Sequence, residues 1–111
     1  MKVDLPATLG GRAPRPARVV DLSLLGCLVR LDSPLARGAV VDLEIEMPDG
    51  SLRVKARVAE ASIDGDTLPA ARPRFLAGLE FLGLAALDGV RMRSFVDAEW
   101  RRRRGANPAS S

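Results

Sequence analysis

The sequence of 111 residues contains no histidine, no tyrosine and a single cysteine, Cys27. The absence of histidine excludes the usual zinc sites, the Ser–His and Cys–His nucleophile pairs and the commonest general base. One cysteine excludes an internal disulfide framework and a cysteine-rich metal site. We therefore expect no catalytic residues, no metal and no cofactor, and we predict a small binding module rather than an enzyme.

Long apolar segments are also absent. No stretch approaches the roughly 18 residues that a membrane span requires, and residues 1–9 lack the apolar core of a signal peptide. We therefore expect a cytoplasmic location and no membrane span. The composition, 47% hydrophobic and 28% charged, is that of a chain that buries a core, which argues against disorder. The length fits one domain, predicted at residues 1–104, with a disordered tail at 105–111.

The small excess of positive charge lies at one end of the chain. Seventeen basic residues stand against 14 acidic ones, and four consecutive arginines occupy positions 101–104. Cations at a helix C-terminus complement the helix dipole, which explains the run without a ligand. The alternative is a contact with a phosphate or an acidic partner. Nucleic-acid binding is disfavoured because only Trp100 adjoins the run and no stacking platform is present.

Apolar and polar residues alternate along most of the chain, which is the pattern of half-buried strands. Between turn signals rich in glycine, proline and aspartate, the alternation predicts strands at 2–9, 17–23, 27–31, 40–47, 52–62 and 74–82. A helix is predicted over 85–103. Short strands with no helices between them favour an all-β fold, a six-stranded antiparallel β-barrel with a C-terminal α-helix over one mouth.

The clearest hairpin joins residues 41–47 to residues 52–58. A four-residue turn at 48–51 pairs Ile45 with Val54, and a one-residue slip would place apolar residues opposite charged ones. On the outer face this register pairs three sets of opposite charges: Glu46 with Arg53, Glu44 with Lys55, and Asp42 with Arg57.

The predicted core follows from the same alternation. Phe95 of the predicted helix closes one barrel mouth. Met92 and Trp100 lie near the edge of the apolar face of that helix. The inward-facing strand residues are Val41, Leu43, Ile45, Val54, Val58, Leu79 and Phe81. The helix residues expected to face the sheet are Leu87, Val90, Phe95 and Val96.

The segment at residues 21–26, Asp-Leu-Ser-Leu-Leu-Gly, carries the only candidate chemistry. Alternation places Asp21 and Ser23 on one side and Leu22 on the other. The carboxylate could accept from the ring N–H and exocyclic amine of a guanine, and the hydroxyl could reach a base edge or a phosphate. Gly26 could adopt a backbone angle closed to other residues and let a ligand approach the main chain. The alternative is a serine- or aspartate-type turn that needs no ligand.

With its flanking strands, this segment resembles the PilZ domain, a bacterial receptor family for cyclic di-GMP. Residues 3–6 resemble the first strand of the family, and residues 18–23 with 26–29 resemble the second and third, with the D/N-x-S-x-x-G signature. Residues 78–82 resemble the last strand, and the helix follows as in the family. The resemblance implies a six-stranded antiparallel barrel with a C-terminal helix, and cyclic di-GMP binding through Asp21, Ser23 and Gly26.

A second family motif is missing. Ligand-binding members carry R-x-x-x-R just before the first strand, where planar guanidinium groups contact the phosphates and the guanine edges. Here the sequence starts with Met-Lys-Val where that motif should already have ended. Arg12, Arg15 and Arg18 are spaced by three and follow the first strand, so they do not match. We therefore expect cyclic di-GMP binding that is weak for the family, or absent. The alternative is a degenerate PilZ domain that binds no nucleotide and acts through an unidentified protein partner.

Overall fold

The computed structural model describes residues 1–10, 13–64 and 73–105. Its elements agree with the predicted strands and helix to within two residues at every end. They are β1 (Lys2–Gly10), β2 (Arg15–Leu22), β3 (Gly26–Leu31), β4 (Val40–Met47), β5 (Gly50–Ile63), β6 (Phe75–Phe81) and α1 (Ala86–Gly105).

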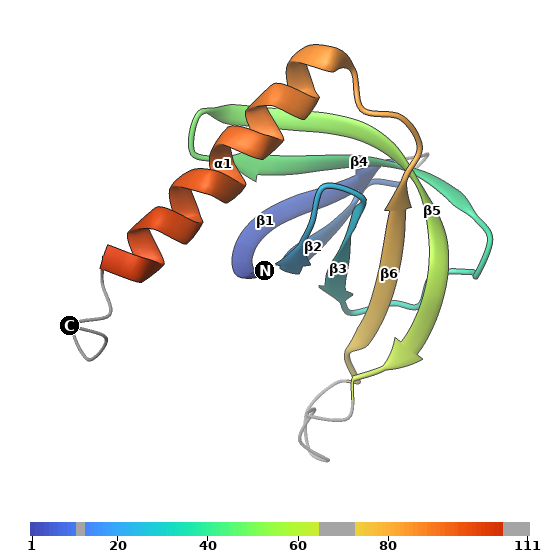
Figure 1. The fold of residues 1–111 in the computed structure, drawn as a ribbon. Coiled ribbons are helices and arrows are strands. Elements are labelled where there is room, and N and C mark those ends of the chain that lie inside the picture. The colour runs from blue at the N-terminus through green and yellow to red at the C-terminus, as the bar shows by residue number, and fades with distance from the viewer. Residues whose placement is uncertain (11–12, 65–72, 106–111) are drawn as a thin grey trace.

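The strands form a closed barrel in the order β1-β2-β3-β6-β5-β4, and every neighbouring pair is antiparallel (Figure 1). Closure leaves no long unpaired strand edge, which explains how such short strands make a stable sheet. The predicted all-β fold, a six-stranded antiparallel β-barrel with a C-terminal α-helix, is confirmed.

The barrel interior is filled by the apolar residues that alternate along each strand. Five of the seven predicted strand core residues are buried: Leu43, Ile45, Val54, Val58 and Leu79. The prediction was wrong for Val41 and Phe81, which are only half-buried. Ala56 of β5 pairs with both of them. Val41 lies near the start of β4 and Phe81 at the end of β6, where the barrel wall ends.

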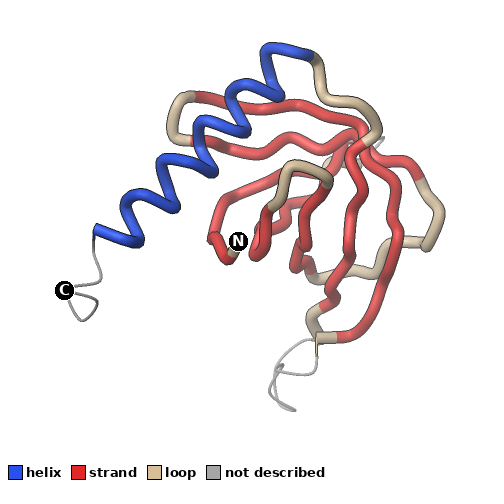
Figure 2. Tube along the Cα trace, in the orientation of Figure 1, coloured by secondary structure: helices blue, strands red, loops and turns tan. Residues whose placement is uncertain are grey.

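The helix closes the barrel with a different residue from the one predicted. Met92 has no exposed surface, whereas Phe95 is partly buried at the margin of the core. Leu87 and Val90, which were expected to face the sheet, are 72% and 61% exposed. Figures 1 and 2 show the reason: α1 crosses the barrel near the β4–β5 turn and then runs on past it, so only a short part of one face meets the core.

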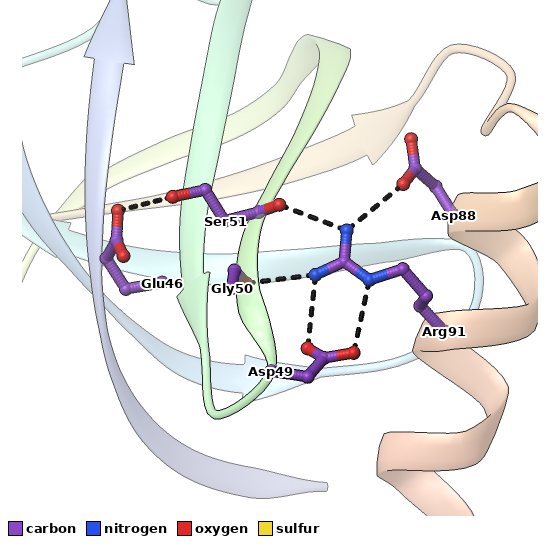
Figure 3. Close-up of polar contacts among 6 residues, drawn as sticks. All are labelled: Glu46, Asp49, Gly50, Ser51, Asp88 and Arg91. Carbon is purple, nitrogen blue, oxygen red and sulfur yellow. Dashed lines mark hydrogen bonds and ion pairs between the residues drawn. The ribbon is translucent and has the colours of Figure 1, made fainter.

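One arginine of α1 holds the β4–β5 turn (Figure 3). The Nε and Nη2 atoms of Arg91 lie 3.2 and 3.1 Å from the two carboxylate oxygens of Asp49. Nη2 and Nη1 also donate to the carbonyl oxygens of Gly50 and Ser51, each at 3.0 Å. Asp88, one helical turn earlier, accepts from Nη1 at 3.3 Å. These contacts fix where the helix crosses the barrel.

The same turn corrects the predicted hairpin register. Ile45 pairs with Leu52, and Val54 pairs with Leu43, so the predicted Ile45–Val54 pair is wrong by two residues. The strands close after Pro48 and Asp49 alone, because Gly50 adopts a φ of +125°, which a glycine tolerates. A shift of two preserves both faces of the strand, so the buried residues stay inside.

The charged pairs move with the register. The observed ion pairs are Glu44–Arg53 at 3.4 Å and Asp42–Lys55 at 2.8 Å. Glu46 instead accepts a hydrogen bond of 2.9 Å from the hydroxyl of Ser51. The three predicted pairs, Glu46–Arg53, Glu44–Lys55 and Asp42–Arg57, are therefore wrong.

At its C-terminal end α1 continues to Gly105, one residue into the segment predicted to be a disordered tail. The rest of that prediction, residues 106–111, lies outside the described residues. Within the described ranges, no helix has both the length and the apolar character needed to cross a membrane.

Candidate functional site

The three predicted site residues come together where β2 ends and β3 begins. Asp21, Ser23 and Gly26 line a shallow hollow of about 200 Å³. We call this the motif hollow, and its complete lining is Asp21, Leu22, Ser23, Gly26, Cys27 and Leu28. Asp21 and Leu28 are partners in the β2–β3 ladder, so the hollow extends from the β2–β3 turn onto the adjoining ends of the two strands.

A bulge in β2 directs Asp21 outward. Val19 is fully buried, and strict alternation from it would also point Asp21 into the core. The β2–β3 register shifts between Val19 and Asp21, so Leu22 becomes the next buried residue instead. An extra residue in one strand re-aims the side chains that follow it. The prediction that Asp21 and Ser23 share one side, opposite Leu22, agrees with this arrangement.

The Asp21 carboxylate already accepts a cationic N–H donor. Its Oδ1 lies 2.7 Å from the amino group of Met1, which also donates to the carbonyl oxygen of Leu22 at 2.9 Å. The hydrogen bond from this amine lowers the pKa of Asp21 below its ordinary value. The Asp21 side chain is 45% exposed, so an ionised acceptor lies on the outer wall at neutral pH.

Ser23 organises the β2–β3 turn. Its Oγ accepts from the backbone N–H groups of Leu25 and Gly26, each at 3.2 Å, and donates to the Gly26 carbonyl oxygen at 3.2 Å. The backbone N–H of Ser23 donates to the same carbonyl oxygen at 2.9 Å. This is the serine-type turn that the sequence left open as an alternative. The serine of the motif therefore has a structural role whether or not a ligand binds.

Gly26 is required by its contact with β6. A Cβ built at this position would overlap the carbonyl oxygen of Leu79, and it would lie 3.3 Å from the Cα of Glu80. The φ of Gly26 is not positive, so the expectation that this glycine adopts a special backbone angle was wrong. The close approach of two backbones explains the glycine instead.

Cys27 lies beneath the hollow. Burial raises the pKa of its thiol to about 12, which keeps the sulfur protonated and unreactive at neutral pH. Among the described residues, no group of three His, Cys, Asp or Glu side chains is placed to hold a metal ion.

A neighbouring hollow is lined by arginines for which the sequence predicts no site. It has a volume of about 470 Å³, and we call it the arginine hollow. Its charged lining residues are Arg18, Arg30, Arg74 and Asp32. Arg18 was not predicted as a site residue because its spacing from Arg15 does not match R-x-x-x-R. No local pattern identifies the group, because its members come from separate segments that only the barrel brings together.

A family model described as PilZ domain matches residues 1–98 of the chain. No curated protein matches the sequence.

Several solved structures share the fold. One is described as the PilZ domain with c-di-GMP of YcgR from Escherichia coli, at 17% identity and a TM-score of 0.73, covering 95% of this chain and 88% of that one. MrkH of K. pneumonia gives 15% identity and a TM-score of 0.77, covering 94% of this chain and 48% of that one. The Bacillus subtilis inhibitor of motility, MotI/DgrA, gives 20% identity and a TM-score of 0.73, covering 96% of this chain and 50% of that one. The present chain thus spans about half the length of MrkH and MotI. At these identities the likeness concerns the fold.

Proposed function

The chain belongs to the PilZ domain family, and from that premise we propose that it is a bacterial signalling module that binds cyclic di-GMP at the motif hollow. Asp21 would accept from the N–H donors of a guanine, and Ser23 would present its hydroxyl at the rim. Gly26 would hold the turn against β6. The module would act as a non-catalytic receptor.

One observation carries this proposal. The three residues of the D-x-S-x-x-G signature line a single hollow, and the ionised carboxylate among them already accepts an N–H donor at 2.7 Å. A guanine offers the same kind of donors from its ring N–H and exocyclic amine, and a carboxylate has two oxygens to receive them. The YcgR PilZ domain of the same fold has been solved with c-di-GMP.

We propose that residues 1–111 by themselves bind cyclic di-GMP weakly. Cyclic di-GMP carries two phosphates, and tight recognition of phosphate uses arginine forks. Residues 1–111 contain no R-x-x-x-R ahead of Val3, and the expected weak binding is proposed for these residues alone. Each charged hydrogen bond is worth roughly 1.5–3 kcal/mol, so the loss of two weakens binding by roughly two to four powers of ten.

Calorimetric titration with cyclic di-GMP tests the proposal. We expect weak binding by the unmodified chain, a marked gain after an Arg-x-x-x-Arg segment is placed ahead of Val3, and loss of that gain in Asp21→Ala. Asp21 is the diagnostic position, because Ser23 and Gly26 also have structural roles.

A matched control is Asp42→Ala, which removes another ion-paired carboxylate, 66% exposed, from β4 on the barrel wall opposite β3. This variant should bind as the parent does. Submicromolar binding by the unmodified chain that Asp21→Ala leaves unchanged would place the ligand elsewhere and refute the proposal.

A second candidate function is action through protein contacts without nucleotide. It is favoured by exposed apolar residues beside the motif: Leu25 is 80% exposed, and Leu24 and Val90 line a hollow of about 410 Å³ between the β2–β3 turn and α1. The same titration separates the two functions. No binding even after the arginine segment is restored would favour the second.

A further inference from the structure

The arginine hollow lies on the barrel wall, at the ends of β2 and β3 remote from the motif turn. Arg18 comes from β2, Arg30 from β3, and Arg74 immediately precedes β6. The complete lining is Pro16, Ala17, Arg18, Arg30, Leu31, Asp32 and Arg74. Three arginines against one aspartate give the hollow a positive lining. At about 470 Å³ it is also larger than the motif hollow, which has about 200 Å³.

Two of these arginines are cross-strand partners. Arg18 lies directly opposite Arg30 in the antiparallel β2–β3 ladder. Like charges at directly opposed positions destabilise a sheet. Ion pairs with Asp4 and Asp64 offset part of this repulsion, and an anion placed between the two guanidinium groups would offset more of it.

Arg18 and Arg30 each form an ion pair with a carboxylate. The Nε and Nη2 of Arg18 lie 2.9 and 2.8 Å from Oδ1 of Asp4. The Nε of Arg30 donates to Oδ2 of the buried Asp64 at 2.8 Å. A guanidinium has five N–H donors. These contacts use one nitrogen of Arg30 and two nitrogens of Arg18, so each arginine has further N–H donors for a ligand.

These contacts also position the guanidinium planes. Because Asp4 and Asp64 hold Arg18 and Arg30 at their Nε atoms, the side chains are anchored on the wall of the hollow. An anchored planar fork matches the oxygens of a phosphate group and loses little conformational freedom on binding it.

From this geometry we propose that the arginine hollow binds a phosphate group of an anionic ligand. The site is separate from Asp21, Ser23 and Gly26, and it does not rest on the proposed function. The Arg18–Arg30 pair lies two residues along β3 from the Asp21–Leu28 pair, roughly 7 Å at the usual strand rise. The phosphate could therefore belong to a nucleotide that also occupies the motif hollow, or to a separate phosphate compound.

Titration of the isotope-labelled protein with inorganic pyrophosphate, followed by amide NMR, tests the site. We expect the largest shifts at Ala17, Arg18 and Leu31, and a roughly tenfold weaker affinity in Arg18→Gln and in Arg74→Gln. Arg30 is left intact because its removal would deprive the buried Asp64 of an ion-pair partner.

The matched control is Arg57→Gln. Arg57 is an exposed arginine of β5, the strand opposite β2 in the closed order, and its replacement changes the net charge equally. This variant should bind pyrophosphate as the parent does. Equal weakening by all three variants would show a general charge effect, and shifts away from the hollow would show another site. Either result overturns the proposal.

A parallel titration with cyclic di-GMP identifies the source of the phosphate. If cyclic di-GMP shifts the amide signals of both hollows, and its affinity is lower in Arg74→Gln, the phosphate is that of the dinucleotide. If cyclic di-GMP shifts the amide signals of the motif hollow alone, while pyrophosphate shifts those of the arginine hollow, the arginine hollow binds a separate phosphate compound. If cyclic di-GMP does not bind even after the arginine segment is restored, the proposed function fails, and the arginine site is judged on the pyrophosphate result.

Discussion

Replacing Gly26 with alanine should destabilise the barrel, because this glycine lies against the backbone of β6. A Cβ at Gly26 would overlap the Leu79 carbonyl oxygen, well inside the 3.0 Å that Cβ atoms essentially never cross. It would also lie 3.2 Å from the Leu79 carbonyl carbon and 3.3 Å from the Cα of Glu80. All three neighbours are backbone atoms, so no side-chain rotation relieves the clash.

The strands must instead separate where Gly26 pairs with Glu80 and Cys27 pairs with Leu79. Overpacking of this kind costs about 1–3 kcal/mol, and a weakened ladder hydrogen bond adds about 0.5–1.5 kcal/mol. We therefore expect Gly26→Ala to lower the free energy of unfolding by roughly 2–4 kcal/mol. In a domain of this size that lowers the Tm by roughly 10–30 °C.

Urea and thermal unfolding, followed by circular dichroism without any ligand, measure this effect. Gly89→Ala is the control, because a Cβ at Gly89 in α1 meets nothing within 4 Å. Alanine is favoured over glycine within a helix by about 0.5–1 kcal/mol, so this variant should be slightly stabilised. If Gly26→Ala unfolds at the same urea concentration as the parent, the account of Gly26 as a packing residue is refuted.

Three further expectations concern other parts of the barrel. Met92→Ala should lower the free energy of unfolding by about 2–5 kcal/mol, because Met92 is fully buried. Phe95→Ala should lower the free energy of unfolding by less. If urea unfolding shows the larger loss for Phe95→Ala, the placement of the helix is contradicted. The Arg91 guanidinium holds the pKa of Asp49 below its ordinary value, so the pair stabilises the fold above that ordinary pKa. The stabilisation is lost as the pH falls through the lowered pKa. In an NMR titration, Arg91→Gln should return the Asp49 pKa toward its ordinary value. Burial raises the pKa of Cys27 to about 12, so iodoacetamide at pH 8 should react slowly with the folded protein and rapidly in urea, as mass spectrometry would detect.

The element boundaries could be read from the sequence because they depend on local patterns. Alternation along Val40–Met47 identifies a strand without reference to its partners, and the turn signals around it mark where it ends. The motif residues could be located for the same reason. Asp21, Ser23 and Gly26 lie within six consecutive residues, so the turn that joins β2 to β3 brings them together.

The hairpin register could not be read in this way. A shift of two residues leaves every side chain of a strand on its original face, so alternation does not distinguish the Ile45–Val54 pair from the observed Ile45–Leu52 pair. The choice depends on the positive φ of Gly50 and on Arg91, which reaches the turn from 41 residues further along the chain.

The sequence by itself determined the strands, the helix, the family and the position of the motif, because each follows from residues that are neighbours in the chain. Only the tertiary structure decided that Met92 closes the barrel, that Gly26 lies against Leu79, and that Arg18, Arg30 and Arg74 share one hollow. These facts depend on which strands pair and where the helix crosses them. Residues brought together across a closed barrel have no fixed spacing in the sequence, so no local pattern reports their contact.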